Sequence, residues 1–391
     1  MRRLGLILLC VFMLFSTGCW DRNEIDRNFF VSTIAVDAGK DINDKKILKD
    51  AKPEDPFGER NIERLQVTYA FPDISGYSAQ KSQIPSDKFI KTEAYSMEDA
   101  MSNAILKSSR NIDIGHASLL LISSDVFQNS KIVKEIVDYL SRNPMINRRM
   151  YVAVAEGSAE QLVKYPLNME STIGAYVNGL MESSKKNAVI IPMTLNEFTI
   201  LLGRSGNAIV PNLKVDSEKK EIKINGISII KNYVIKGTLN PQETSAIEIL
   251  RGKLISGKKV IYYNDEPIDM EIDNIKRKIK LTQEADKLNI NVLVEIEGKV
   301  KQYTTDKNLL DGGFLDKLQN YYAESISTEG KEIFTAIQRE YGVDLIGIRE
   351  YVEKFKPSMW RKVENNWEET YKSANMNLDV RVELRRIGIK K

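Results

Sequence analysis

The sequence predicts an α/β to α+β fold in which mixed sheets and amphipathic helices form two successive domains, with a third domain as an alternative. Three observations predict it. Strand patterns alternate with short amphipathic helical patterns between residues 88 and 157, as in an α/β layer. Longer strand patterns with fewer helices follow after residue 220, as in an α+β arrangement. The 391 residues are 42% hydrophobic, which is enough for a large core, and their number favours two or three domains.

The chain opens with the pattern of a secretory signal peptide at residues 1–18. Arg2 and Arg3 precede an apolar run from Leu4 to Phe15, and small residues follow this run. The run has about 12 residues, whereas a helix that crosses a bilayer needs about 20. We therefore expect this segment to direct export and then to be removed.

Cys19 directly follows the small residues Ser16, Thr17 and Gly18, and this ending resembles the bacterial lipobox. In a lipobox, a diacylglycerol is attached to the cysteine thiol and the signal is cut just before it. Ser16 departs from the pattern, because leucine is usual three residues before the cysteine. We expect an acylated Cys19 that binds membrane lipid; the alternative is a secreted chain with a free amino-terminal cysteine. The other cysteine, Cys10, would be lost with the signal, which leaves no disulfide and no thiolate metal site.

The segment after this cysteine, Trp20 to Arg27, mixes opposite charges with one tryptophan. Because it would directly follow an acylated residue, it would lie at the lipid headgroups, where tryptophan is common. We expect Trp20, Asp21 and Glu24 to dock close to the membrane. The alternative is a solvated linker.

The N-terminal region, residues 19–205, is expected to form an α/β layer. Residues 28–39 are rich in β-branched and aromatic side chains and end in a turn signal, which predicts a buried strand. Ser96, with Asp99 three residues later, predicts the start of a helix. In order, we expect strands at 28–39, 62–74 and 88–95, a helix at 96–110, a strand at 116–127, a helix at 130–143, a strand at 148–157, and helices from about 158, at 171–186 and at 194–203.

The C-terminal region, residues 206–391, is expected to be α+β, and a further division near residue 265 is the alternative. Asn225–Gly226 and Lys231–Asn232 are turn signals between short β-rich runs. Pro241 near a helix start and Gly252 at its end predict a helix between them. The remaining expected elements are strands at 270–283 and 288–302, helices around 333–341 and 348–355, and a last strand at 378–388.

No catalytic site is visible in the sequence, and we expect no enzyme, no cofactor and no bound metal. Zinc catalysis needs a tight cluster of ligands, but the chain has one histidine, His116, at the start of an apolar strand. We expect His116 to make a structural hydrogen bond. The acidic pair Glu368 and Glu369 is expected on a solvated helix face rather than as glycosidase carboxylates. The sequence contains no G-x-S-x-G, G-x-G-x-x-G or P-loop motif.

The charge balance does not favour nucleic acid as a partner. The chain has 57 basic and 54 acidic side chains, and removal of Arg2 and Arg3 leaves 57 − 2 = 55 against 54. After residue 18, no stretch approaches 18 uninterrupted apolar residues. We therefore expect a soluble body that only its lipid holds to a membrane, and two or more acyl chains make such an attachment lasting.

Three separated stretches share one family pattern. The first is CWDRNEIDRNFFVSTIAVD, residues 19–37, and the second runs from GHASLLLISSDVF to DYLSRNPMINRRMYVAVAEGSAEQLV. The third, DLIGIREYVEKFKPSMWRKVENNWEETY, is the most specific. Its characteristic residues are Asp344, Gly347, Pro357, Trp360, Trp367 and Tyr371. Together these stretches resemble the Ger(x)C family, the C-subunit lipoproteins of bacterial spore germinant receptors.

The resemblance implies a lipid-anchored subunit on the outer face of the spore inner membrane, the extracytoplasmic side. Its implied partners are the integral membrane A and B subunits, which with it respond to small nutrients and trigger germination. The resemblance implies no enzyme and no known ligand site in this subunit. One rival hypothesis is an extracytoplasmic solute-binding lipoprotein, which needs a cleft between two lobes lined by aromatic and charged groups. A second rival is a lipoprotein hydrolase that acts on spore peptidoglycan.

Trp360 and Trp367 are seven residues apart, which places both indoles on the same side of one predicted helix. Tryptophan is highly buried on average, so we expect both residues in the core. The alternative is an exposed site for a partner.

Overall fold

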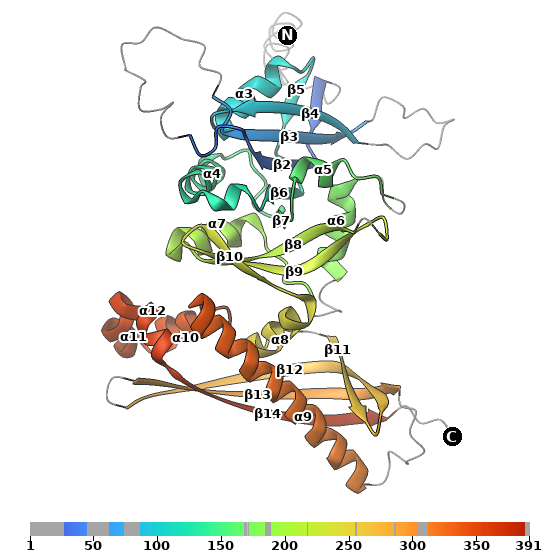
Figure 1. The fold of residues 1–391 in the computed structure, drawn as a ribbon, viewed down its shortest axis with the longest axis vertical. Coiled ribbons are helices and arrows are strands. Elements are labelled where there is room, and N and C mark those ends of the chain that lie inside the picture. Colours follow the sequence, from blue (N-terminus) through green and yellow to red (C-terminus); the bar gives the residue numbers. More distant parts are fainter. Residues whose placement is uncertain are drawn as a thin grey trace, which may run out of the picture.

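The computed structural model of the chain describes residues 27–44, 62–73, 87–167, 170, 172–183, 189–216, 218–254, 256–284, 287–302 and 312–387. These residues form two main sheets that follow one another along the long axis of the molecule, with the larger sheet toward the N-terminus (Figure 1). The expected mixed fold of sheets and helices is confirmed. None of the described helices combines the length and the apolar composition that a membrane span requires.

The larger sheet has eight strands in the order β10-β9-β8-β7-β6-β2-β3-β4. Neighbours among its central strands β8, β7, β6 and β2 are parallel, and antiparallel strands extend it at both edges. The strands are β2 (Thr33–Ala38), β3 (Leu65–Pro72), β4 (Asp87–Ala94), β6 (Leu119–Ser123), β7 (Tyr151–Ala155), β8 (Ala208–Asp216), β9 (Glu221–Lys231) and β10 (Val234–Leu239). A separate parallel pair consists of β1 (Asn28–Phe30) and β5 (Asn111–Asp113).

Both faces of the larger sheet are covered, because successive side chains of a strand point to opposite faces. In β6, Leu120 and Ile122 join one buried cluster, whereas Leu119 and Leu121 join another. Helices α3 (Met97–Leu106), α4 (Ser130–Arg142) and α7 (Leu195–Ser205) contribute to the first cluster, and α5 (Ala159–Val163) and α6 (Ile173–Ser183) contribute to the second. The unbroken apolar run of β6 is typical of a parallel strand that is covered on both faces.

Helix termini in this layer follow the capping rules. The Ser96 hydroxyl accepts a hydrogen bond from the Asp99 amide at 3.2 Å, which confirms the predicted start of α3. At α7, Thr194 and Glu197 form a complete capping box, and Gly206 ends the helix with a φ of +69°. Local sequence therefore determines where these helices begin and end.

The turn expected at Asn225–Gly226 is wrong, because β9 continues through both residues. They form a bulge, since the pairing of β9 with β8 shifts so that both residues lie opposite Asn212. Gly226 has a φ of +85°, and a Cβ atom at this position would clash with the Leu239 carbonyl oxygen. Glycine is therefore required where β9 closely approaches the end of β10.

Helix α8 (Pro241–Arg251) carries the chain from the larger sheet to the smaller one (Figure 1). Pro241 lies in its first turn and Gly252 follows it in the left-handed conformation, as the sequence predicts. Strands β8 to β10 belong to the larger sheet, although they follow the predicted domain boundary between residues 205 and 206. The domain boundary between residues 205 and 206 stays a prediction, and so does the alternative division near residue 265.

The smaller sheet has four strands in the order β11-β12-β13-β14, of which the last two are parallel. They are β11 (Gly257–Tyr263), β12 (Glu266–Glu284), β13 (Lys287–Gln302) and β14 (Asn375–Ile387). The long helix α9 (Gly312–Thr335) lies across one face (Figure 1), where the Tyr322 hydroxyl donates to the Ile268 carbonyl at 2.7 Å. The other face carries polar side chains, such as the ion pair between Lys278 and Glu295 at 2.8 Å.

After α9, a π-helical turn (Ala336–Tyr341) leads to α10 (Ile348–Phe355), α11 (Pro357–Val363) and α12 (Trp367–Ser373). The single helix expected to carry Trp360 and Trp367 is therefore divided, with a 3₁₀ turn (Glu364–Asn366) between α11 and α12. The two indoles still lie side by side, with ring centroids 5.7 Å apart. Buried residues of both sheets and of these helices form one continuous hydrophobic cluster, so the two halves of the chain pack directly against each other.

Candidate functional site

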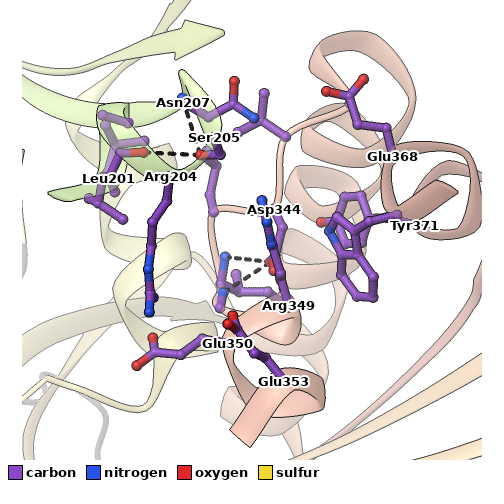
Figure 2. Close-up of a pocket in the computed structure, with 18 of the residues that line it drawn as sticks. Leu201, Arg204, Ser205, Asn207, Asp344, Arg349, Glu350, Glu353, Glu368 and Tyr371 are labelled. Carbon is purple, nitrogen blue, oxygen red and sulfur yellow. Dashed lines mark hydrogen bonds between the residues drawn. The ribbon is translucent and has the colours of Figure 1, made fainter. Parts of the chain in front are cut away.

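A cavity of about 580 Å³ lies where the layer of the larger sheet meets the C-terminal helices (Figure 2). This volume is within the range of small-molecule sites. One wall comes from the end of α7 and the start of β8 and includes Leu201, Arg204 and Asn207. The opposite wall comes from β12, α10, α12 and the loop before α10, and it includes Arg277 and Trp367. Both halves of the chain are therefore needed to form the cavity.

Asp344 holds the loop that leads into α10. Its carboxylate accepts hydrogen bonds from the backbone N–H groups of Ile346 (3.2 Å), Gly347 (3.0 Å) and Arg349 (2.5 Å). It therefore caps the start of α10, and Gly347 supplies the φ of +78° that this loop needs. Burial raises the pKa of Asp344, while the N–H donors act to lower it.

Arg277 joins three elements at the cavity. Its guanidinium donates to the Leu250 carbonyl at 3.2 Å and to the Ile346 carbonyl at 2.5 Å. These bonds connect β12 to the end of α8 and to the loop before α10. Burial lowers the pKa of Arg277, and the nearby Asp344 carboxylate opposes this shift. Arginine remains protonated at neutral pH, so Arg277 brings a positive charge to the cavity.

Aromatic side chains from α12 form part of the cavity wall. Trp367 is 7% exposed and Tyr371 is 1% exposed, and their rings stack with centroids 6.1 Å apart. Trp360 is half-buried beside Trp367, and the Arg349 guanidinium lies 5.3 Å from the centre of its ring in a cation–π contact. The Tyr371 hydroxyl is buried and has no hydrogen-bond partner among the described residues. We propose that Trp360 and Trp367 belong to the hydrophobic core. A measurement of stability can test this proposal.

Charged side chains of both signs line the same cavity. The positive residues are Arg204, Arg251, Lys253, Arg277 and Arg349, and the negative residues are Asp344, Glu350, Glu353, Glu364, Glu368 and Glu369. Part of this charge is already paired, because Glu368 lies 3.2 Å from the Lys231 ammonium. The five glutamates are exposed, and the Asp344 carboxylate already accepts backbone N–H groups at the start of α10. The described lining therefore contains no pair of buried carboxylates that lack hydrogen-bond partners. The cavity presents charges of both signs, and its described lining contains no histidine or cysteine.

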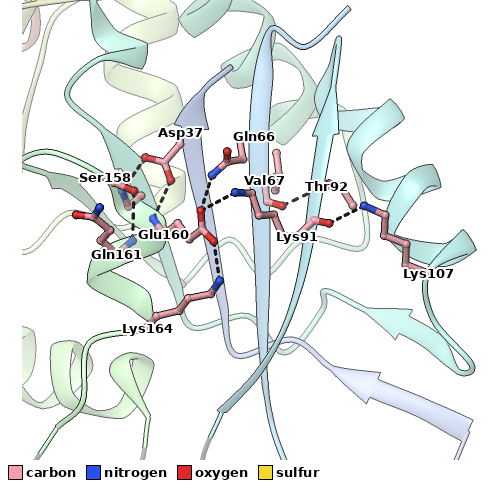
Figure 3. A network of polar contacts seen from close by, with 11 residues as sticks. Asp37, Gln66, Val67, Lys91, Thr92, Lys107, Ser158, Glu160, Gln161 and Lys164 are labelled. Atoms are coloured by element: carbon pink, nitrogen blue, oxygen red, sulfur yellow. Dashed lines mark hydrogen bonds and ion pairs between the residues drawn. The ribbon is translucent and has the colours of Figure 1, made fainter. Parts of the chain in front are cut away.

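A second polar cluster joins strands β2 and β4 to helix α5 (Figure 3). The Asp37 carboxylate accepts hydrogen bonds from the Ala159 and Glu160 amides, each at 2.7 Å, and so caps α5. The Glu160 carboxylate pairs with Lys91 at 3.0 Å and with Lys164 at 2.6 Å. Burial acts to raise the pKa of Glu160, but the two ammonium groups outweigh it and the pKa is lowered. Because its charges are matched internally, this cluster is a structural link between elements.

His116 lies on an exposed turn and does not belong to the lining of the cavity. Its side chain is 67% exposed, with Nδ1 3.6 Å from an Asp113 carboxylate oxygen. Its ring contacts the Phe30 ring edge-on, with centroids 4.8 Å apart. Within the described residues, no group of three or more His, Cys, Asp or Glu side chains is arranged to hold a metal.

Of the residues that characterise the family pattern, Asp344, Gly347, Trp367 and Tyr371 line the cavity, and so do Glu368 and Glu369. Cys19, Trp20, Asp21 and Glu24 are not among the described residues, and of the two tryptophans only Trp367 belongs to the cavity lining. The sequence reasoning missed the arginines of the cavity, because each belongs to a different element.

The position of Arg277 in the strand pattern could have indicated a site from the sequence. In β12, the inward positions Ile275, Ile279 and Leu281 are apolar, and Arg277 occupies the position in this series where another apolar residue is expected. A charge on the buried face of a strand indicates a polar partner or a site.

The fold is a mixed arrangement of two sheet layers with a cavity between the two halves of the chain. Comparison with known proteins gives the family. Residues 21–215 match the family model described as spore germination protein N-terminal domain, and residues 225–388 match the model described as spore germination B3/GerAC like, C-terminal. The chain therefore belongs to the Ger(x)C family, the C subunits of spore germinant receptors.

Individual relatives extend over almost the whole chain. The chain is 26% identical to spore germination protein YndF of Bacillus subtilis (strain 168), over 98% of this chain and 96% of that protein. It is 25% identical to spore germination protein A3 of the same strain, over 96% of this chain and 95% of that protein. The crystal structure of the GerBC protein matches with a TM-score of 0.60 at 19% identity, covering 82% of this chain and 94% of that chain. This last likeness shows a shared fold.

Proposed function

We propose that this protein is a lipid-anchored, non-enzymatic subunit of a spore germinant receptor that is needed for the nutrient-triggered germination response. It acts through contacts with the integral membrane A and B subunits of the receptor. The observation that carries the proposal is the family match over both halves of the chain, which begins at residue 21, directly after the Cys19–Trp20 pair. The protein lies on the outer face of the spore inner membrane, on the extracytoplasmic side.

Attachment through an acylated Cys19 is supported by the short apolar run and the small residues before it. Lasting attachment needs more than one acyl chain, which a diacylglycerol on the thiol provides. The tether confines the body to a thin layer beside its partners and raises its effective concentration there without any new contact. Contacts that are weak in solution then become sufficient for assembly.

The test of this proposal is a pair of cysteine variants in spores. Cys19→Ala should abolish lipid labelling, block lipoprotein-type processing and reduce copurification with the A and B subunits, because the thiol is the acylation point. Cys10→Ala is the matched control, since this residue lies within the signal peptide and should leave labelling unchanged. Undiminished lipid labelling of the Cys19→Ala variant would refute the anchor.

The cavity between the two halves favours a second candidate function, the capture of the nutrient itself by a solute-binding lipoprotein. Its lining matches what that function requires, because Arg204 and Glu350 bring opposite charges and Trp367 brings an aromatic face. Figure 2 shows the Arg204 side chain extending toward Glu350 across the cavity. A ligand with both a positive and a negative group would suit such walls.

Titration calorimetry of the mature chain against a panel of nutrients tests this second candidate. Arg204→Gln should weaken any binding at the cavity at least tenfold, which corresponds to about 1.4 kcal/mol. Arg142→Gln is the matched control, since Arg142 lies on α4 and pairs with Asp138 at 2.9 Å, outside the cavity lining. Absence of heat for every nutrient, or equal affinity of the two variants, would exclude nutrient capture at this cavity.

A further inference from the structure

The C-terminal end of helix α3 presents two large apolar side chains to solvent. Leu106 is 85% exposed and Ile105 is 51% exposed, whereas Met97, Ala100 and Ala104 of the same helix are buried. Isolated exposed apolar residues are common, but two adjacent ones at a helix end form a patch that water solvates poorly. The patch lies on α3, at the end of the molecule that also holds β5 (Figure 1).

The connection between this patch and the start of the described chain is short. Ser108 closes the turn between α3 and β5, because its hydroxyl donates to the Arg110 carbonyl at 2.6 Å. The Arg110 guanidinium lies 5.0 Å from the centre of the Phe29 ring in β1. Strands β1 and β5 pair in parallel from their first residues. Leu106 is therefore one tight turn away from β5, which pairs with β1, the first strand of the described chain.

Positive side chains lie next to the apolar pair. Lys107 directly follows Leu106, and its ammonium donates to the Lys91 carbonyl at 2.9 Å. Neither Lys107 nor Arg110 forms an ion pair within the described part of the chain. The carboxylate of Asp113 in β5 already accepts the Gly115 amide at 2.7 Å. The patch thus combines exposed apolar surface with two cations that no carboxylate of the described residues pairs with.

The length of the tether determines what this surface meets. Eight residues, 19–26, connect Cys19 to Arg27, and at a maximum of about 3.6 Å per residue they reach about 29 Å. An acyl group on Cys19 therefore keeps Arg27, directly before β1, within about 29 Å of the lipid headgroups, and the end of α3 lies one tight turn from the strand that pairs with β1. For this reason we choose a lipid surface, rather than a second copy of the chain, as the occupant.

We propose that Ile105, Leu106, Lys107 and Arg110 form a docking surface for an anionic bilayer. The proposal rests on the lipid attachment of Cys19 proposed above. The apolar pair enters the boundary between headgroups and acyl chains, and the two cations pair with lipid phosphates, as in amphipathic segments at membrane interfaces. A tether sets only the distance of a protein from the membrane, whereas this second contact sets its orientation. It turns the N-terminal end toward the bilayer and the smaller sheet away from it.

A fluorescence experiment on the acylated protein tests the orientation. An environment-sensitive dye is attached to Leu106→Cys, or to the control Ile200→Cys on α7, where the native side chain is 48% exposed. Each protein is bound to vesicles of phosphatidylcholine and phosphatidylglycerol. We expect emission from position 106 to shift to shorter wavelength and quenching by aqueous iodide to fall at least fivefold, while position 200 keeps its values in water.

A second measurement avoids the dye. The mature chain with Cys19→Ala carries no lipid, so its binding to vesicles reports the surface alone. We expect the double variant Ile105→Ser, Leu106→Ser to bind anionic vesicles about tenfold more weakly, and Ile200→Ser to bind as before. Vesicles of phosphatidylcholine alone should bind the unaltered surface more weakly than anionic vesicles.

The outcomes separate this inference from the proposed function. If the acylated protein stays on the vesicles while the dye at position 106 reports water, the docking surface is wrong and the anchor stands. A shift that appears only when the A and B subunits are present also overturns it, because the surface would then bind protein. If the acylated protein does not bind vesicles at all, both the anchor and the docking surface fail.

Discussion

Asp37 and Asp344 have the same role in the two halves of the chain. Each carboxylate accepts backbone N–H groups at the start of a helix, α5 for Asp37 and α10 for Asp344. Both residues belong to stretches that resemble the family, and the sequence alone did not assign them a role. For Asp37 the reason is distance, since its partner Ala159 is 122 residues further along the chain. At the residue scale, the backbone geometry of two helix starts explains these positions.

Asp87 at the start of β4 should make stability depend on pH. Burial raises its pKa from 3.8 to about 6, although the Ile173 N–H acts to lower it, and one of its oxygens has no hydrogen-bond partner in the described residues. The native state therefore holds this proton more tightly than the unfolded chain. The stabilisation from the bound proton is complete below about pH 4 and is lost as the pH rises through about 6.

Asp87→Asn should accordingly raise the melting temperature near neutral pH, where the native protein carries the poorly solvated charge, and should flatten the profile between about pH 4 and 6. Thermal melts of both proteins across this range provide the measurement. Asp138→Asn is the control, because Asp138 is an exposed residue of α4 that pairs with Arg142. A variant whose melting temperature follows pH just as the parent does would show that Asp87 does not contribute.

At the scale of elements, local patterns predicted most strands and helices, and tertiary contacts caused the differences. The caps at Ser96 and Pro241 are local signals, and the structure has both. The bulge at Asn225–Gly226 was mistaken for a turn because the approach of Leu239 cannot be read from nearby residues. For the cavity, the sequence singled out Asp344, Gly347, Trp367 and Tyr371 but not the arginines, since only the fold brings α7, α8 and β12 together.

Gly226→Ala should destabilise the protein by at least about 2 kcal/mol, because a side chain at a positive φ is strained and would also meet the Leu239 carbonyl. Denaturant unfolding of the mature chain measures the change. Gly179→Ala in α6 is the control, since a Cβ atom there meets nothing within 4 Å and alanine favours a helix. Equal stabilities of the two variants would argue against a required glycine in the bulge.

Trp367→Ala should cost about 3–5 kcal/mol of unfolding free energy, because the buried indole stacks on Tyr371 and contacts Trp360. Trp360→Ala should cost less, since this residue is half-buried. Melting temperatures and subunit copurification are measured together. A variant that melts like the parent but fails to assemble would place these tryptophans at a partner interface instead of in the core.

At the scale of the whole molecule, two sheet layers share one hydrophobic cluster, and the cavity lies between them. Membership of the Ger(x)C family and a mixed fold were both predicted from the sequence, and both are confirmed. The cavity was foreseen only as a requirement of the solute-binding alternative. Its exact lining depends on how the halves pack, because Arg204 and Asp344 are 140 residues apart in the chain (344 − 204) and face the same space.

Spores that carry surface and cavity variants distinguish subunit contact from nutrient capture most directly. One set changes exposed residues over both halves, and the other changes Arg204 and Glu350 in the cavity. For each variant, the levels of the A and B subunits are measured together with germination as a function of nutrient concentration. If the protein works through contacts, variants on one contiguous face should lower subunit levels and germination together, and cavity variants should leave the concentration dependence unchanged. If cavity variants instead shift the concentration dependence while subunit levels stay normal, the contact proposal is contradicted and nutrient capture replaces it.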